Sequence, residues 1–377
     1  MNQRLQSATI NRPVPTVDCK SDPPLCGIVL AGGEGKRLRS FVYLLRGDLL
    51  PKQYVSFVGT RSMLTHTFQR AERLVSPERV YTVVNQQHLL FPEVRQQLSA
   101  RASDTVLVQP ENKQSGAGVL LSLVHLYKRY PNSTVAVFPA DQFAMEDVLM
   151  KYVRLAGAIV RKQPSKLVLL GIRPEGEEPD YGYIVPRNHF NNDGWGGLEV
   201  SRLVEKPAVG EISDLLRRGA LWNTMMMVFK AANFLDWVSD LMPAVSQRFQ
   251  KIYDAIGTAN ETEIVREVYS QLEPINFSTD LLEPLIRYHP KGVVSLPLDD
   301  VMWSDWGTES RVLNILRRMG NASRLNGLPS LLREPMTLIE RETETPRVAQ
   351  KRIAQHVTAR ETVPKESDLN GVDQRSV

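Results

Sequence analysis

The segment from Cys26 to Lys52 constrains this chain more than any other part of the sequence. Residues 26–31 are a short apolar run, which predicts a buried β-strand. The glycine-rich turn GGEG follows at 32–35, and a Lys-Arg pair ends at Arg37. Glycines directly after a strand let the backbone approach a ligand closely, and backbone N–H groups beside cations attract anions. We therefore predict a polyphosphate-binding loop, to which Lys52 adds a further cation.

Two common phosphate motifs do not fit this loop. A Walker motif needs a Ser or Thr where Arg37 stands and a glycine where Leu30 stands. The dinucleotide fingerprint needs a third glycine at the position of Leu38. A tight turn without any ligand remains an alternative for the glycine-rich turn taken alone.

Strands and helices alternate through the first half of the chain. The expected strands are 79–84, 105–108, 134–138 and 166–171, and the expected helices are 63–75, 86–99, 116–130 and 147–160. This order predicts an α/β fold with a doubly wound, mostly parallel sheet of the Rossmann-like kind, covered on both faces. Ligands of such sheets bind beyond the carboxyl ends of the strands, where the glycine-rich loop and Asp141 both lie.

The pattern changes near residue 180, which indicates an inserted α+β portion. Strands are expected at 181–186, 198–205 and 293–296, with a turn at 191–194, and helices at 209–218, 231–239, 244–256, 261–271 and 309–318. We expect residues 1–24 to be a flexible lead-in, 25–320 to be the folded domain and 321–377 to be a polar, mostly disordered tail with a short helix near 347–358.

Charge and composition exclude several classes of function. Residues 311–377 hold 12 of the 46 Lys and Arg and 8 of the 42 Asp and Glu, so the remaining chain has 34 of each and is neutral. Such a body shows no basic excess for nucleic acid. No apolar run reaches the ~20 residues of a membrane span, and the start lacks the apolar core of a signal peptide. With only Cys19 and Cys26, we expect a cytoplasmic protein in which Cys26 is a small core residue.

The motif LAGGEGKRL followed by PKQ resembles the signature of the sugar-1-phosphate nucleotidyltransferases, and PKQ is similar to the mannose-1-phosphate guanylyltransferase branch. The resemblance spans about residues 25–320. It continues through 139–142 (PADQ), 205–207 (EKP), 222–224 (WNT) and 303–308 (WSDWGT) in the order of the family.

The resemblance implies a reaction of a sugar-1-phosphate with a nucleoside triphosphate that releases pyrophosphate. Its nucleophile is a phosphate oxygen that is already ionised, so the site needs charge neutralisation and alignment rather than a general base. Mg²⁺ is the expected cofactor because it prefers carboxylate oxygens, and Asp141 and Asp305 match the metal positions. Arg37 and Lys52 match groups that hold the triphosphate, and Lys206 matches the lysine that holds the sugar phosphate.

The remaining predicted contacts divide between base and sugar. Glu205 and Asn223 match sugar-binding positions. The amide of Gln109 can present a donor and an acceptor to a base edge, and Gly116 would let a planar base approach closely. The predicted nucleotide contacts are Leu30, Ala31, Gly32, Gly33, Gly35, Gln109 and Gly116.

Several positions depart from the pattern of the family and leave alternatives open. Ser40 stands in place of a proline, an insert follows at 41–50, Gln142 replaces a common histidine and Met225 replaces a glycine. Because of Met225, we expect a narrowed or altered sugar pocket. GTP with mannose-1-phosphate is the preferred pair, and glucose-1-phosphate with UTP or dTTP is the alternative. A non-catalytic nucleotide-sugar-binding relative, a helix-capping role for Asp141, a turn-closing role for Asp305, a solvated Glu205–Lys206 pair and a homo-oligomer all stay open.

Overall fold

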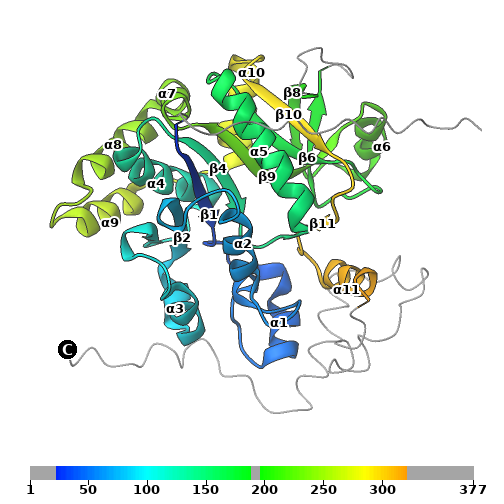
Figure 1. The fold of residues 1–377 in the computed structure, drawn as a ribbon, viewed down its shortest axis with the longest axis horizontal. Helices are drawn as coiled ribbons and strands as arrows, with labels where there is room; N and C mark the ends of the chain where they lie inside the picture. The colour runs from blue at the N-terminus through cyan, green and yellow to red at the C-terminus, as the bar shows by residue number, and fades with distance from the viewer. Residues whose placement is uncertain (1–22, 188–195, 321–377) are drawn as a thin grey trace, which may run out of the picture. The chain divides into compact units, whose positions relative to one another are not determined.

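The computed structural model describes residues 23–187 and 196–320 of the 377-residue chain, and its main sheet has nine strands in the order β3-β2-β1-β4-β9-β6-β10-β8-β7 (Figure 1). The sheet strands are β1 Leu25–Leu30, β2 Val80–Asn85, β3 Val106–Gln109, β4 Thr134–Pro139, β6 Leu167–Ile172, β7 Gly182–Pro186, β8 Leu198–Glu205, β9 Leu221–Lys230 and β10 Val293–Leu298. A small second sheet pairs β5 (Phe143–Ala144) with β11 (Trp303–Ser304).

Strands β1 to β4 form the parallel half of the sheet. Their residues are mostly apolar and almost fully buried, which is the pattern of strands covered on both faces. The end of β1 at Leu30 lies beside Val83 of β2 and Pro139 of β4. This register places the glycine-rich loop and Asp141 at one edge of the sheet.

Strand β9 joins the two halves of the sheet. Its C-terminal part pairs antiparallel with β4, whereas its start pairs with β7, and both pairings use the same edge of β9. Its other edge pairs antiparallel with β6, which continues to β10, β8 and back to β7. The second half therefore closes on β9, beside the edge that carries the glycine-rich loop.

Helices cover both faces of the sheet. Cys26 and Ile28 of β1 pack into a large core cluster with α4, α7, α8 and α9, while the buried side chains of α2 and α5 pack elsewhere along β1, β4 and β9. The helices are α1 Arg39–Arg46, α2 Met63–Ala71, α3 Pro92–Leu98, α4 Gln114–Arg129, α5 Glu146–Lys162, α6 Val209–Arg217, α7 Ala231–Leu241, α8 Pro243–Ala255, α9 Glu261–Gln271, α10 Glu283–Tyr288 and α11 Glu309–Arg318.

The α/β class with a Rossmann-like half and an α+β portion is confirmed. Every antiparallel pairing of the main sheet involves β7, β8 or β9, so the parallel pairing expected from the sequence is concentrated in the first half. The insert at 41–50 contributes to α1, which ends at Arg46 and is followed by Gly47 as its C-cap. Cys26 is fully buried, as expected, and burial raises the pKa of its thiol to about 12.

Other expectations fall outside the described residues. These are the lead-in before residue 23, the turn at 191–194, the tail from 321 and its short helix near 347–358. The domain limits at 24 and 320 therefore stay predictions. Across residues 23–187 and 196–320, none of the helices has the length and apolar character that crossing a membrane requires.

Gly116 in the first turn of α4 provides a test of this packing. A Cβ at Gly116 would lie 2.5 Å from Ile275 Cγ2 and 2.8 Å from the Ile275 carbonyl oxygen, to which the Gly116 amide donates a hydrogen bond. We expect Gly116→Ala to lower the free energy of unfolding by about 1–3 kcal/mol, measured by urea denaturation. Gly210→Ala in α6 is the matched control, because nothing lies within 4 Å of its Cβ position. Equal stability of the two variants would contradict this packing.

Candidate active site

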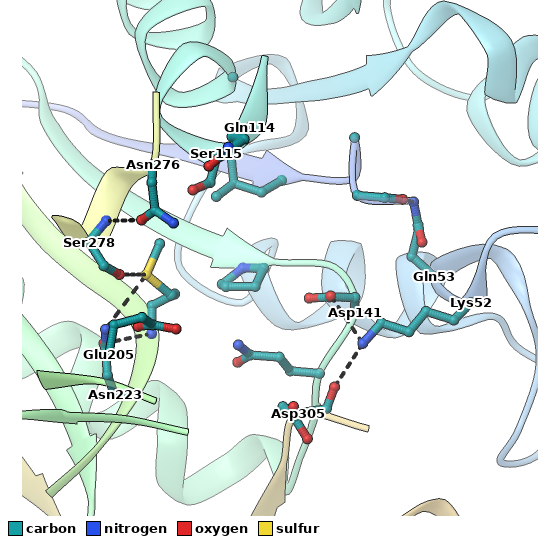
Figure 2. Close-up of a pocket in the computed structure, with 18 of the residues that line it drawn as sticks. Lys52, Gln53, Gln114, Ser115, Asp141, Glu205, Asn223, Asn276, Ser278 and Asp305 are labelled. Atoms are coloured by element: carbon teal, nitrogen blue, oxygen red, sulfur yellow. Dashed lines mark hydrogen bonds and ion pairs between the residues drawn. The ribbon is translucent and has the colours of Figure 1, made fainter. Parts of the chain in front are cut away.

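A pocket of about 430 Å³ opens at the carboxyl ends of β1 and β4 and extends to β7, β8 and β9 (Figure 2). Elements far apart in the sequence contribute its walls. All but three of the predicted site residues line it. Those that do are Leu30, Gly32, Gly33, Arg37, Lys52, Gln109, Asp141, Glu205, Lys206, Asn223 and Asp305.

Lys52 contacts the carboxylate of Asp141 and the backbone of Asp305, the two predicted metal-binding residues. Its Nζ is 3.1 Å from Asp141 Oδ2 and donates hydrogen bonds to the backbone carbonyls of Asp305 at 2.9 Å and Trp306 at 3.3 Å. Figure 2 shows the ammonium group pointing between Asp141 and Asp305. Only 8 % of the Lys52 side chain is exposed, so the charge needs these partners. One lysine thereby joins the segment after β1, the end of β4 and the loop after β11.

A second group of charges lies beside this lysine. Arg37 is 3.2 Å from Asp180 and 3.4 Å from Asp305. Arg311 of α11 donates to both carboxylate oxygens of Asp305, at 3.0 and 3.2 Å, and stacks 4.4 Å from the centre of the Tyr181 ring. Cations and carboxylates therefore alternate at this end of the pocket, which suits a ligand that carries both phosphates and a metal ion.

The glycine-rich loop is held from behind by buried side chains. The Gln53 amide donates to the carbonyls of Ala31 and Gly33, both at 2.7 Å. The Tyr54 hydroxyl donates to the Ala31 carbonyl at 3.1 Å and lies 3.2 Å from His88 Nδ1. These bonds hold the loop carbonyls away from the pocket. Inside the pocket, the carbonyl oxygens would repel an anion.

Gln109 at the end of β3 lines the pocket beside the glycine-rich loop. The Gln109 side chain is buried, and its Oε1 accepts a hydrogen bond from the Tyr269 hydroxyl at 3.2 Å. Its Nε2 would lie 2.6 Å from a Cβ at Gly32, so a larger residue there would displace the Gln109 amide. The predicted closeness of Gln109 and the glycine-rich loop is therefore present in the structure.

The three predicted contacts that do not line the pocket are Ala31, Gly35 and Gly116. Ala31 is buried beneath the loop, where its carbonyl accepts the two hydrogen bonds given above. Gly35 has a φ of 59° and would place a Cβ 3.1 Å from Lys52 Cγ, so it allows the loop to pass over the lysine. Gly116 packs against Ile275 and Gly118 lines the pocket, so the contact of Gly116 with a base stays a prediction.

The opposite end of the pocket carries uncharged donors and one carboxylate. Asn223 is 7 % exposed and Ser278 is 5 % exposed, and both lie near Glu205 (Figure 2). Burial raises the pKa of Glu205 above its usual range, although the nearby Lys206 opposes this shift. A partly desolvated carboxylate beside amide and hydroxyl groups is suited to binding the hydroxyls of a polar ligand.

Sequence reasoning missed several lining residues. Asp180 lies two residues before β7, and its place beside a conspicuous Tyr-Gly pair was the available signal. Asn276 and Ser278 come from a short π-helical segment, Phe277–Leu282, and its preceding cap, which no sequence pattern indicated. Gln114 and Ser115 were not missed, because they belong to the segment 109–116 against which we expect the base to lie, and they line the pocket from the start of α4.

The described residues contain no group of three or more His, Cys, Asp and Glu side chains arranged to hold a metal ion. Lys52 instead contacts the Asp141 carboxylate, whereas the Asp305 carboxylate is paired with Arg37 and Arg311. A metal ion at this end of the pocket would therefore need water and ligand phosphates to complete its coordination, which is the usual arrangement for Mg²⁺.

Comparison with known proteins places this pocket in a family. The sequence model of the family described as nucleotidyl transferase matches residues 26–321. The chain belongs to the nucleotidyl transferase family. This match covers the glycine-rich loop and every predicted site residue.

Curated relatives of this nucleotidyl transferase include the xanthan biosynthesis protein XanB of Xanthomonas campestris pv. campestris, 26% identical over 303 residues, which are 80% of this chain and 61% of that protein. Another is the mannose-1-phosphate guanylyltransferase RfbM of Salmonella typhimurium, 26% identical over 305 residues, or 80% of this chain and 60% of RfbM. The chain spans about three fifths of the length of these relatives.

Two solved structures share the fold of this nucleotidyl transferase. A Thermus thermophilus protein named mannose-1-phosphate geranyltransferase superimposes with a TM-score of 0.63 at 24% identity, covering 77% of this chain and 79% of that one. A Helicobacter pylori protein named mannose-6-phosphate isomerase gives a TM-score of 0.55 at 20% identity, covering 74% and 99%. At these identities they show the fold alone.

His88, behind the glycine-rich loop, makes the stability of the protein depend on pH. Burial lowers the pKa of His88 to about 4, so the folded protein keeps this histidine neutral. As the pH falls below about 6.5, the His88 side chain binds a proton in the unfolded chain but not in the folded one. The free energy of unfolding therefore falls by about 2 kcal/mol by about pH 5. We expect His88→Asn to lose less stability than wild type over this range, measured by urea denaturation at each pH.

His289→Asn is the control for this measurement. His289 is half-buried and lies outside the pocket, next to Trp237. Its replacement should leave the pH dependence of unfolding as it is in wild type. A His88→Asn curve parallel to the wild-type curve would show that His88 is not held neutral by burial.

Proposed function

We propose that this chain transfers a nucleoside monophosphate from a nucleoside triphosphate to a sugar-1-phosphate and releases pyrophosphate, with GTP and mannose-1-phosphate as the substrates. The observation that carries the proposal is Lys52 between Asp141 and Asp305, opposite a hydroxyl-binding end of the same pocket. The family of the chain and the name of relatives such as RfbM support the choice of reaction and substrates.

The charges divide the pocket into two ends. Arg37 and Lys52 lie at the glycine-rich loop, where a triphosphate would meet backbone N–H groups and cations. Glu205 and Asn223 lie at the far end, and Lys206 is available to the phosphate of a sugar. The sugar phosphate would thus enter opposite the leaving pyrophosphate, as an in-line displacement requires.

The chemical step needs no proton transfer. An oxygen of the sugar phosphate attacks the α-phosphorus of the triphosphate, the bond from that phosphorus to the β-bridging oxygen breaks, and pyrophosphate leaves. Arg37 and Lys52 would neutralise the charge that develops on the leaving oxygens, and Lys206 would hold the attacking phosphate. The buried surroundings of Lys52 strengthen these interactions.

The donor set at the cationic end fits a magnesium ion. Asp141 and Asp305 offer carboxylate oxygens from two loops that converge on one lysine, and Mg²⁺ prefers such hard oxygens completed by water and substrate phosphates. Asp141 and Asp305 would hold the ion, which when bound would neutralise phosphate oxygens of the nucleotide. Arg311 already fixes the orientation of the Asp305 carboxylate.

The proposal is tested by pyrophosphate release from the purified full chain with Mg²⁺. Four nucleoside triphosphates are crossed with mannose-, glucose- and N-acetylglucosamine-1-phosphate. We expect release with GTP and mannose-1-phosphate. Release only with UTP or dTTP and glucose-1-phosphate would keep the reaction and change the substrates. No release with any pair, from a chain that binds a nucleotide-sugar, would support a non-catalytic relative.

Removing the charge of Asp141 tests the metal assignment. Asp141→Asn should lower kcat/KM by about 10²-fold or more and leave the melting temperature within a few degrees of wild type, because Asn can still accept a hydrogen bond from Lys52. The matched control is Asp104→Asn, an exposed carboxylate paired with Arg129 outside the pocket. Near wild-type turnover of the Asp141 variant would overturn the assignment.

A further inference from the structure

Met225 stands out at the hydroxyl-binding end of the pocket. Its φ of 57° lies in the left-handed region, which an unbranched side chain adopts at a cost and glycine adopts freely. The side chain is half-buried and lines the pocket. Strained residues of this kind persist where the surrounding structure holds them, often at functional sites.

The strain has a visible cause in the pairing of β9. Leu169 of β6 pairs with Met227 and Gly171 pairs with Asn223, so β9 carries extra residues that form a bulge around Met225. On the other edge, β4 pairs with residues 227–230 and β7 pairs with residues 221–222. The bulge therefore lies in the gap between these two pairings, where β9 borders the pocket.

The sulfur of Met225 is the acceptor for both uncharged donors at this end. Asn223 Nδ2 lies 3.7 Å from Met225 Sδ, and Ser278 Oγ lies 3.5 Å from the same atom. The Asn223 Oδ1 accepts the Met225 backbone N–H at 3.0 Å, which orients the amide. A thioether is a weak acceptor, so a hydroxyl oxygen would be a better partner for both donors.

We propose that Met225 determines which sugar phosphate this pocket accepts, by filling the space in which a substituent on the sugar ring would lie. Because the thioether accepts only weakly, Asn223 and Ser278 can donate to the ring hydroxyls of a bound sugar instead. The bulk of the Met225 side chain excludes a hexose phosphate that carries an N-acetyl group. The methionine side chain is slightly longer than an acetyl group, so its removal would make room for one. This inference rests on the proposed function for the sugar-phosphate end of the pocket.

The test compares Met225→Gly with Met225→Leu. The glycine variant removes the side chain and relieves the left-handed backbone, whereas leucine keeps the bulk without the sulfur. The quantity measured is the ratio of kcat/KM for N-acetylglucosamine-1-phosphate to that for mannose-1-phosphate, with GTP and Mg²⁺. We expect the ratio to rise about tenfold or more in Met225→Gly and to stay at or below the wild-type value in Met225→Leu.

A ratio unchanged within about twofold in the glycine variant would overturn the inference, while wild-type turnover would still support the reaction. If wild type turns over no pair, the proposed reaction fails, and calorimetric binding of the two sugar phosphates decides the inference by the ratio of their Kd values. Met225→Asn replaces the glycine variant if that variant does not fold, because asparagine tolerates the left-handed region.

We also expect the melting temperature of Met225→Gly to be higher than that of Met225→Ala, because alanine keeps the strained φ.

Discussion

The burial of the Lys52 ammonium group is the interaction on which the rest of the site depends. A lysine with so little exposure is stable only with charged or polar partners, and here they are the Asp141 carboxylate and the carbonyls of residues 305 and 306. These partners come from two different parts of the fold. The lysine therefore fixes the end of β4 and the loop after β11 relative to the glycine-rich loop, whose Gly35 passes directly over its stem.

Backbone strain is concentrated around this centre. Among the described residues, the non-glycine residues with positive φ are Gln114, Lys206, Met225, Asp300 and Trp306. The first three line the pocket, and Trp306 directly follows Asp305. Strain of this kind lowers the stability of the folded protein. Its location beside the charged and polar groups indicates that the surrounding fold holds these residues in strained conformations to shape the pocket.

The sequence predicted the first half of the fold because its signals are local. Buried parallel strands are apolar runs, and the loops after them carry the glycines and aspartates, so their common edge follows from topology. Strand β9 was missed because its Trp-Asn-Thr-Met-Met-Met run has no alternation and is interrupted by the bulge at Met225. Its antiparallel place between β4 and β6 depends on tertiary pairing.

The residues of the candidate site were predictable where they belong to a sequence motif. They were missed where only the folding of distant segments brings them to the pocket. Asn276, Ser278 and Arg311 reach the pocket or its charges from distant segments without a motif of their own. The position of Gly116 outside the pocket lining was not predictable, because a glycine signals a close approach without saying what approaches. The partner is Ile275, and no sequence pattern links these two residues.

We propose that the pocket aligns two phosphates for direct transfer, with no protein nucleophile. The exchange of labelled pyrophosphate into GTP tests this most directly. We predict exchange when GDP-mannose and Mg²⁺ are supplied and none when GTP, Mg²⁺ and labelled pyrophosphate are incubated without a sugar substrate. Exchange without any sugar substrate would require a covalent nucleotidyl-enzyme and would contradict the account, as would the absence of exchange under both conditions.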